Sequence, residues 1–568
     1  MAFYRNLSFV EIATQKRASA VFLVGLFVTT ILISPFSADP VNLPKFVSLV
    51  FFSSLCFVMC IADIKLKEFK RAGSFGAATI SFVFGAIAVS ALSDSDVVTR
   101  FYGIQGRNIG LVTLLALAMF MFTGYLLTSE NLNTRVISLL ITIGLLSVSY
   151  GFLQYLNMDP LKWDSNFGRI LGFFGNPNFL SAILGLSGIA AVGSLKAGRR
   201  SIKRNSLITG FILLVIISIL ISNSSQGILV LIIGTTFIIY AKFLNTFSRK
   251  IHILFIFLIL LGPVILYASL IKYFPTGSLA EIGSIKERGT YWEVGFRVWL
   301  ENPLFGTGLD TFGESFRFYR NLDNIEVVSG TLTNSAHNYF IDILANGGVV
   351  LFLPVLYLVI RAVLQVYRAL IDIKKVSSQD LTIIGIWIGL FTQAQISPNQ
   401  IGLLVWFWAC TGLVIGLEVR IFQHSSIIVS AKTPTLVEKR KKEKYQLEAS
   451  QIILSFISVI VSLVIALPPY VASVRYLNAL NSGQVEKIYA STLNFPMDVT
   501  RNIAVIEAFS NNQFHAQAHS LAIITVEKFP QSFSAWAQLY RIANALPKEK
   551  ELALLNMKRL DPNNPKLP

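Results

Sequence analysis

Two stretches of the chain, at residues 286–312 and 334–348, contain residues suited to catalysis or ligand binding. The first starts near Arg288 and ends in a Gly306-x-Gly308 turn, and the second contains His337 directly before an apolar segment. A Gly-x-Gly turn lets backbone N–H groups approach an anion or a sugar closely. An imidazole beside the positive end of a helix stays neutral and can accept a proton. These residue types suggest an anion- or sugar-binding turn and a general base.

The same residues also have purely structural interpretations. An arginine with tryptophans, as in Arg288 and Trp292, commonly anchors a protein at a membrane interface. Asn334 or Ser335 is expected to cap the helix that follows, with His337 in its first turn as an interfacial residue. From the residues alone, both interpretations stay open.

The elements that must position these residues are membrane helices. Of the 568 residues, 54% are hydrophobic and 14% are charged, which is far more apolar surface than one soluble core can bury. Apolar segments near the length of a membrane span, roughly 20 residues, predict an all-α polytopic membrane protein with about 12–13 transmembrane helices. They lie at about 18–37, 46–63, 74–92, 109–128, 136–156, 173–195, 207–222, 227–241, 251–271, 339–360, 381–396, 400–419 and 451–470.

Basic residues alternate with these segments and predict the orientation of the chain. The amino terminus and the Lys439–Lys444 cluster fall on the cytoplasmic side, where basic residues accumulate. The net charge of +17 is explained by such loops and by anionic lipid headgroups, and indicates no nucleic-acid partner. The predicted organisation is a transmembrane domain at 1–470, with a large external loop at 272–338, followed by an external tail at 471–568.

The tail shows a repeat. Phe495-Pro496 and Phe529-Pro530 lie 34 residues apart, and Asp561-Pro562 follows 32 residues later. A period near 34 residues predicts a tetratricopeptide-like helical array. Because so few repeats rarely fold alone, we expect the tail to pack on the long loop or on membrane helices. It is either a solubilising cap or a surface that binds a partner or a glycan.

Six motifs follow one another along the chain. They are Gly106-Arg107-x-x-Gly110, Gln154-Tyr155, Arg169-Ile170-x-Gly172-x-Phe174-Gly175-Asn176-Pro177-Asn178, Arg288-x-x-x-Trp292, Pro303-Leu304-x-Gly306-x-Gly308 with Phe312, and Ser335-x-His337-Asn338 followed by Gly347-Gly348. In order, spacing and placement they resemble the signature of the O-antigen ligase and polymerase superfamily, over roughly 90–420. The resemblance implies an all-helical membrane fold of the type-C glycosyltransferase class.

The resemblance also implies a reaction and roles for residues. Members of the superfamily transfer a glycan from a polyprenyl diphosphate to an external acceptor hydroxyl, without a metal or other cofactor. Arginines would bind the departing diphosphate, Arg288 first, then Arg169 and Arg107, with Arg297 a looser candidate. His337 would be the general base. Where the family usually has an arginine, this chain has Gln226, which can donate hydrogen bonds but brings no charge.

Several alternatives stay open within and beyond this resemblance. The acceptor is a lipid core, a growing glycan or a protein, and the sequence does not choose among them. A transporter or flippase of a lipid-linked saccharide would use the same spans and intramembrane polar residues without covalent chemistry. A scaffold that recruits envelope enzymes through its tail would leave Arg288 and His337 without a role. In each case the expected location is a bacterial inner or plasma membrane, among its lipids.

Overall fold

The computed structural model describes residues 9–61, 73–161, 170–196, 201–243, 283–328, 330–398, 400–422 and 449–567. Throughout these ranges the regular structure is helical, with no strand. The apolar segment expected at about 251–271 and the basic cluster Lys439–Lys444 lie outside the described residues.

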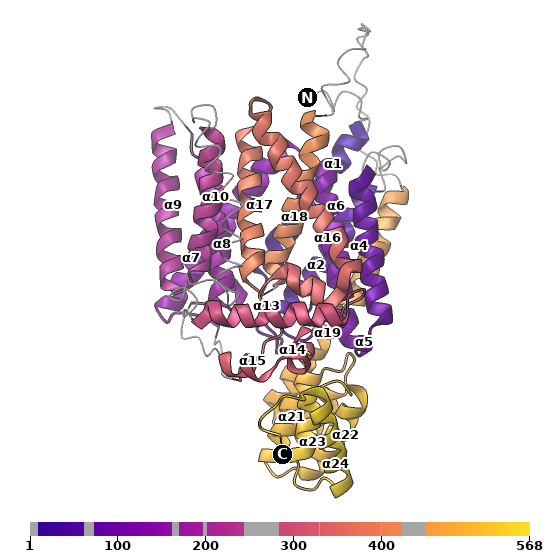
Figure 1. Cartoon of the computed structure of the whole chain (residues 1–568). Coiled ribbons are helices and arrows are strands. Elements are labelled where there is room, and N and C mark those ends of the chain that lie inside the picture. Colours follow the sequence, from indigo (N-terminus) through magenta and orange to yellow (C-terminus); the bar gives the residue numbers. More distant parts are fainter. Residues whose placement is uncertain are drawn as a thin grey trace.

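A bundle of helices forms the main body of the molecule (Figure 1). Its members are α1 (Phe9–Ile31), α2 (Asn42–Ile61), α4 (Gly73–Leu92), α6 (Leu111–Leu127), α7 (Glu130–Tyr155), α8 (Pro177–Gly193), α9 (Ile202–Ile221), α10 (Gln226–Lys242), α16 (Tyr339–Ile371), α17 (Ser378–Ile396), α18 (Ile401–Leu417) and α19 (Ala449–Ser482). Seven helices of the described chain are long and apolar enough to cross a membrane, and α6, α8 and α10 are shorter apolar helices. The prediction of an all-helical, polytopic membrane protein is confirmed.

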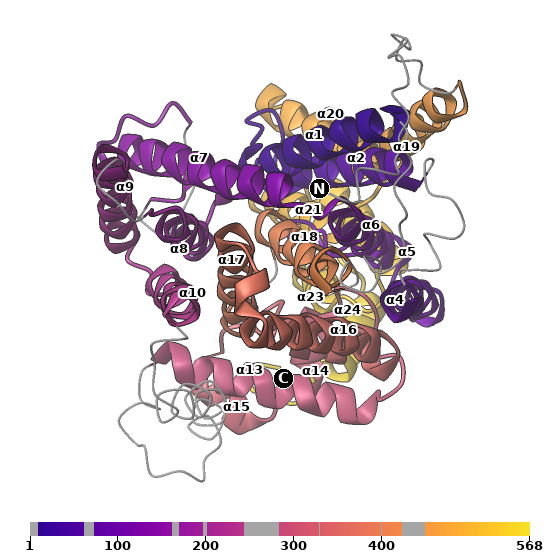
Figure 2. The ribbon, with the colours of Figure 1, turned by 90° about the horizontal axis from the view of Figure 1, so that it is seen from above.

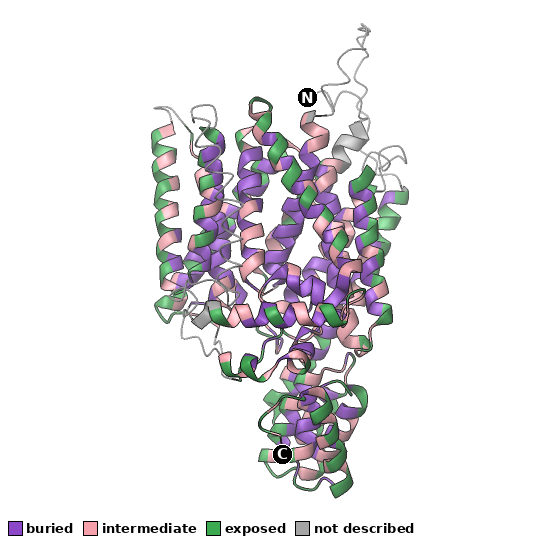
Figure 3. Ribbon diagram, viewed as in Figure 1, coloured by how far each residue is buried: buried purple, intermediate pink, exposed green. Residues whose placement is uncertain are grey.

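The centre of the bundle is α18, which is buried on all sides, whereas α9 lies at the rim with few buried residues (Figures 2 and 3). Helix α18 packs closely on α6 because Gly412 faces that helix. A Cβ atom at Gly412 would lie 2.0 Å from the Met121 carbonyl oxygen. A helix that is apolar all round suits such a central position, and one with an exposed apolar surface suits contact with lipid.

The segment expected as a long external loop contains three helices in its described part. They are α13 (Gly283–Glu301), α14 (Phe312–Tyr319) and α15 (Leu322–Val327). Helix α13 lies across one end of the bundle, beside α16 (Figures 1 and 2). Its apolar residues form a small core with α14 and the start of α16, which includes Trp292, Phe312 and Ala336. Trp292 is 7% exposed and so belongs to this core. The expectation that it anchors the chain at a membrane interface is therefore not met.

The carboxyl-terminal tail is a separate helical layer below the bundle (Figure 1). Helix α19 runs unbroken through residue 470, the predicted domain boundary, and ends at Ser482. It is followed by α20 (Val485–Thr492), α21 (Val499–Asn511), α22 (His515–Lys528), α23 (Phe533–Arg541) and α24 (Pro547–Leu560). These helices share a core of their own that includes Phe509, Leu521 and Trp536. A tetratricopeptide repeat stays a prediction for this tail.

The tail packs on the loop helices, as expected. A buried carboxylate near the carboxyl terminus, Asp561, pairs with Arg320 at 2.6 Å and with Arg317 at 3.8 Å. The side-chain amide of Asn563 also donates to the Arg320 carbonyl oxygen at 2.9 Å. These contacts tie the end of the chain to α14 and to the residue that follows it.

Replacing Asp561 by alanine should loosen the tail from α14. Arg320 would be left buried without its carboxylate partner, at a cost of about 2 kcal/mol. Limited proteolysis of the purified protein should then cut the tail faster and at lower temperature than in the wild type. Asp372→Ala is the control, because the pair of Asp372 with Lys375 is about half exposed and such pairs contribute little. Equal proteolysis of both variants would contradict this role of Asp561.

Candidate active site

Residues from five separate parts of the chain meet at the end of the bundle that α13 covers. Arg107 lies in the turn before α6, Arg288 on α13, and His337 two residues before α16. The remaining two parts are the first turn of α10, with Gln226, and the last turn of α17, which ends at Ile396. The structure thus brings together three of the candidate residues named from sequence, and Gln226 is joined to them through α17.

Arg288 is held in place by the end of α17. Its Nε atom donates to the Ile396 carbonyl oxygen at 3.1 Å. Burial lowers the pKa of the guanidinium group below its usual value, but such a group starts so far above neutral pH that it stays charged. One turn further along α13, the Tyr291 ring lies 5.2 Å from the His337 ring, centroid to centroid. Arg288 and His337 are therefore neighbours, with a cation and a potential base on facing elements.

His337 has an unusual backbone conformation and environment. Its φ angle is 53°, in the left-handed region that a histidine adopts only where surrounding contacts hold it there. Its Nδ1 atom is buried and has no hydrogen-bond partner in the described part of the chain. Burial, followed by the positive charges of Arg288 and Arg107, lowers the pKa of the imidazole from 6.5 to about 3. At physiological pH this histidine is neutral and can accept a proton.

The cap of α16 differs from the expectation. Asn338 is the N-cap, and its side-chain oxygen accepts from the backbone N–H groups of Phe340 and Ile341 at 3.0 and 3.3 Å. Neither Asn334 nor Ser335 takes that position, because the chain turns sharply at His337 before the helix starts. His337 therefore lies outside the first helical turn, and the structure gives it no capping role.

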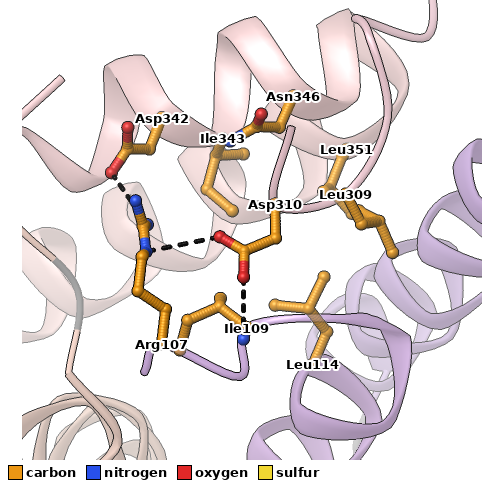
Figure 4. Close-up of a pocket in the computed structure, with 9 residues that line it drawn as sticks. All are labelled: Arg107, Ile109, Leu114, Leu309, Asp310, Asp342, Ile343, Asn346 and Leu351. Atoms are coloured by element: carbon orange, nitrogen blue, oxygen red, sulfur yellow. Dashed lines mark hydrogen bonds and ion pairs between the residues drawn. The ribbon is translucent and has the colours of Figure 1, made fainter. Parts of the chain in front are cut away.

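Arg107 lies between two buried carboxylates (Figure 4). Its Nε atom is 3.3 Å from Asp310 and its guanidinium is 3.8 Å from Asp342. The other oxygen of Asp310 accepts from the backbone N–H groups of Ile104 and Ile109, at 2.9 and 3.3 Å. A cavity of about 20 Å³ beside these three side chains has room for one water molecule. The charge of Arg107 is thus already shared by two acidic groups.

The Gly306-x-Gly308 turn is joined to a break in α16. The N–H groups of Thr307 and Gly308 donate to the carbonyl oxygens of Ala345 and Asn346, at 3.1 and 3.0 Å. Gly348, with φ 57° and ψ −163°, interrupts the helix there. A Cβ atom at Gly306 would lie 2.4 Å from the Asn346 carbonyl carbon, so only glycine fits. The amides of residues 307 and 308 are engaged inside the protein, and the turn holds α16 against the end of α13.

The other predicted residues occupy different surroundings. Gln226 is buried at the start of α10, and its side-chain oxygen accepts from Gln393 of α17 at 2.9 Å. The guanidinium of Arg297 donates to the Glu293 carboxylate and to the Tyr319 carbonyl oxygen, each at 2.8 Å. Arg169 lies outside the described residues. The segment that follows it is held by Gln154, whose side-chain oxygen accepts from the N–H groups of residues 171 and 172.

Sequence reasoning missed the end of α17 and Asp310, and it gave no role to Asp342, a polar residue near the start of the apolar segment after His337. Asn338 donates to the backbone and side-chain oxygens of Gln395, each at 3.2 Å, so one turn of α17 contacts Arg288, Asn338 and Gln226. Polar residues at the end of an apolar segment, here Gln393 and Gln395, were the available signal. The spacing of Arg107, Asp310 and Asp342 along the chain does not indicate that both carboxylates pair with this arginine.

Comparison with known proteins points in the same direction. Residues 210–356 match a protein-family model described as O-antigen ligase. The match extends from α9 into α16 and contains Gln226, Arg288 and His337, whereas Arg107 precedes it. No curated protein matches the chain. The segment that carries Arg288 and His337 is thus similar to O-antigen ligases, and this similarity supports a ligase-like role in polysaccharide biosynthesis at a bacterial membrane.

Proposed function

We propose that this protein transfers a glycan from a polyprenyl diphosphate carrier to a hydroxyl group of an external acceptor. The observation that carries the proposal is the juxtaposition of Arg288 and a neutral His337 at one end of a membrane bundle. Such a site has a cation for a leaving diphosphate and a base for an attacking hydroxyl.

The reaction follows from these two groups. The acceptor oxygen attacks the anomeric carbon as its proton moves to the imidazole of His337, and the bond from that carbon to the diphosphate oxygen breaks. The products are the glycosylated acceptor and polyprenyl diphosphate. The imidazolium of His337 then releases its proton to the diphosphate or to solvent. Attack opposite the leaving group inverts the anomeric centre. The guanidinium of Arg288 stabilises the negative charge that grows on the diphosphate, so the proposed mechanism needs no metal ion.

The orientation of the site is part of the proposal. At the opposite end of the bundle, Arg361 and Arg368 pair with Glu418, and Arg420 pairs with Asp380. Basic residues gather at the cytoplasmic ends of membrane helices, and this tendency supports an external position for the Arg288–His337 end. The tail packs on α14 at that same end (Figure 1), a position that favours a protein or polymer acceptor slightly over a lipid core.

Reconstitution in liposomes tests this function. The protein would be given a polyprenyl-diphosphate-linked oligosaccharide together with a lipid, glycan or protein acceptor, and products would be identified by mass spectrometry. We expect a glycosylated acceptor and free polyprenyl diphosphate in equal amounts. A flippase would move the intact donor between leaflets and form neither product, and that result would overturn the proposal.

A further inference from the structure

The turn that carries His337 is held by a carboxylate from the helix that follows it. Ser335 donates through its hydroxyl to one oxygen of Asp342 at 2.6 Å, and the Ala336 N–H donates to the other oxygen at 2.7 Å. The Ser335 hydroxyl also accepts from the His337 N–H at 3.0 Å. A single hydroxyl thus joins the carboxylate to the backbone of the proposed base.

These hydrogen bonds hold the backbone of His337 in a left-handed conformation that is unfavourable without them. A left-handed backbone at a residue with a Cβ atom is unfavourable, so His337 keeps it only while the surrounding contacts are intact. Asn338 caps α16, so Asp342 is not needed as the cap. Both oxygens of Asp342 are directed at residues 335 and 336 in addition to Arg107.

Asp342 is in turn held by Arg107, from the turn before α6. Arg107 lies 3.8 Å from Asp342 and 3.3 Å from Asp310 (Figure 4). Both carboxylates are almost completely buried, and the arginine side chain is 12% exposed. Asp310 accepts from two backbone N–H groups of the turn that contains Arg107. A chain of contacts therefore runs from Asp310 through Arg107, Asp342 and Ser335 to His337.

We propose that Ser335 and Asp342 are positioning residues for His337, and that Arg107 serves as the counter-ion of Asp342 in this chain of contacts. The inference rests on the proposed function, in which His337 is the base. This counter-ion role of Arg107 differs from the diphosphate-binding role that the family resemblance implies for it. Two carboxylates already balance the charge of that arginine. Arg288 then remains as the principal cation for the diphosphate.

The first test is kinetic. Ser335→Ala should lower kcat about 5- to 10-fold, because a base displaced by a fraction of an ångström takes up the proton less efficiently, and should leave the donor KM nearly unchanged. Ser335→Thr keeps the hydroxyl and should restore most of the activity. In a His337→Asn background, Ser335→Ala should cause no further loss, because it acts only through the histidine. Ser315→Ala is the matched control, since this buried serine of the same loop bonds to Thr307 and Thr311.

A second readout does not depend on activity. The chain has five histidines, so the ring signal of His337 in ¹³C-histidine-labelled protein can be identified by its loss in His337→Asn. Ser335→Ala and Asp342→Asn should both shift that signal, and Ser315→Ala should not. If the His337 signal shifted in both variants but the wild-type protein transferred no glycan, the proposed function would be wrong. The contacts of Ser335 and Asp342 would still be shown to position His337. An unchanged His337 signal in both variants, or an equal loss of kcat with and without His337, would overturn the inference.

Discussion

Replacing His337 by asparagine should lower turnover roughly 10²- to 10⁴-fold, the usual contribution of a general base. The variant should still insert, fold and bind the lipid-linked donor. Asparagine is the best replacement here because it tolerates the left-handed backbone of this position, with φ 53°, and stays polar without accepting the proton. Turnover and donor binding would be measured on purified protein in liposomes.

The pH dependence of kcat and of kcat/KM should reflect the pKa of His337. Its pKa in the empty site is lowered to about 3 by burial and by Arg288 and Arg107, and a base is active above its pKa. The plot of kcat/KM, which reports the free enzyme, should therefore show no acid limb from His337 between pH 5 and 8. The diphosphate of a bound donor offsets the charges of Arg288 and Arg107 but not the burial, so it should raise the imidazole pKa above its value in the empty site. Any acid limb should therefore lie at higher pH in the plot of kcat than in the plot of kcat/KM.

His337→Gln is the second variant for this prediction. Glutamine is close in size to histidine but is disfavoured in the left-handed region. The thermal stability of the His337→Gln variant therefore reports the strain of the backbone at this position, and its turnover reports the loss of the base. If asparagine and glutamine variants with matched thermal stability both turned over at near-normal rates, His337 would have no part in the mechanism. The arginines would then be the only supported site residues.

Arg288 is expected to show the second large effect. Arg288→Lys keeps the charge but loses the planar pair of donors, and should lower transfer roughly ten-fold or more, about 1.4 kcal/mol of transition-state stabilisation. Arg288→Ala also loses the charge, and should lower kcat on the order of 10²-fold, as when one preorganised donor is removed. The measurement is the rate of polyprenyl diphosphate release at saturating donor.

Lys286→Ala is the matched control for this series. Lys286 lies on the same helix, two residues before Arg288, and is exposed. Its loss removes a positive charge from α13 without touching the site, so transfer should stay within about two-fold of wild type, in keeping with the small effects of exposed charges. Full transfer by both Arg288 variants, or an equal fall in Lys286→Ala, would rule out a diphosphate clamp at Arg288.

Much of the architecture could be predicted from local sequence. The length and hydropathy of each apolar segment are properties of neighbouring residues, and the expected spans coincide with helices throughout the described chain. The two groups that matter most for the proposed chemistry, Arg288 and His337, were recognised because their types and spacing form motifs. The 34-residue period of the tail led to the expectation that it packs on the loop or on membrane helices, and the pair of Asp561 with Arg320 shows a contact with the loop.

The interior of the site could not be predicted in the same way. Asp310 and the N–H group of Ile104 lie 206 residues apart along the chain, and their hydrogen bond exists only because α6, α13 and α16 pack at one end of the bundle. The Gly306-x-Gly308 turn looked suited to bind a ligand, but its amides donate to α16 where Gly348 breaks that helix. Asn338 rather than Asn334 or Ser335 became the cap because of a left-handed turn at His337.

The sequence by itself thus determined which segments are helices, which of them suit a membrane, and which residue types are available for the proposed glycan transfer. The tertiary structure decided their partners: Arg107 beside two carboxylates, Arg288 against the end of α17, and His337 on a turn held by Asp342 through Ser335. Helical periodicity and hydropathy act between residues a few positions apart. Burial of charge and the geometry of hydrogen bonds depend on distant segments, and are settled only when those segments pack together.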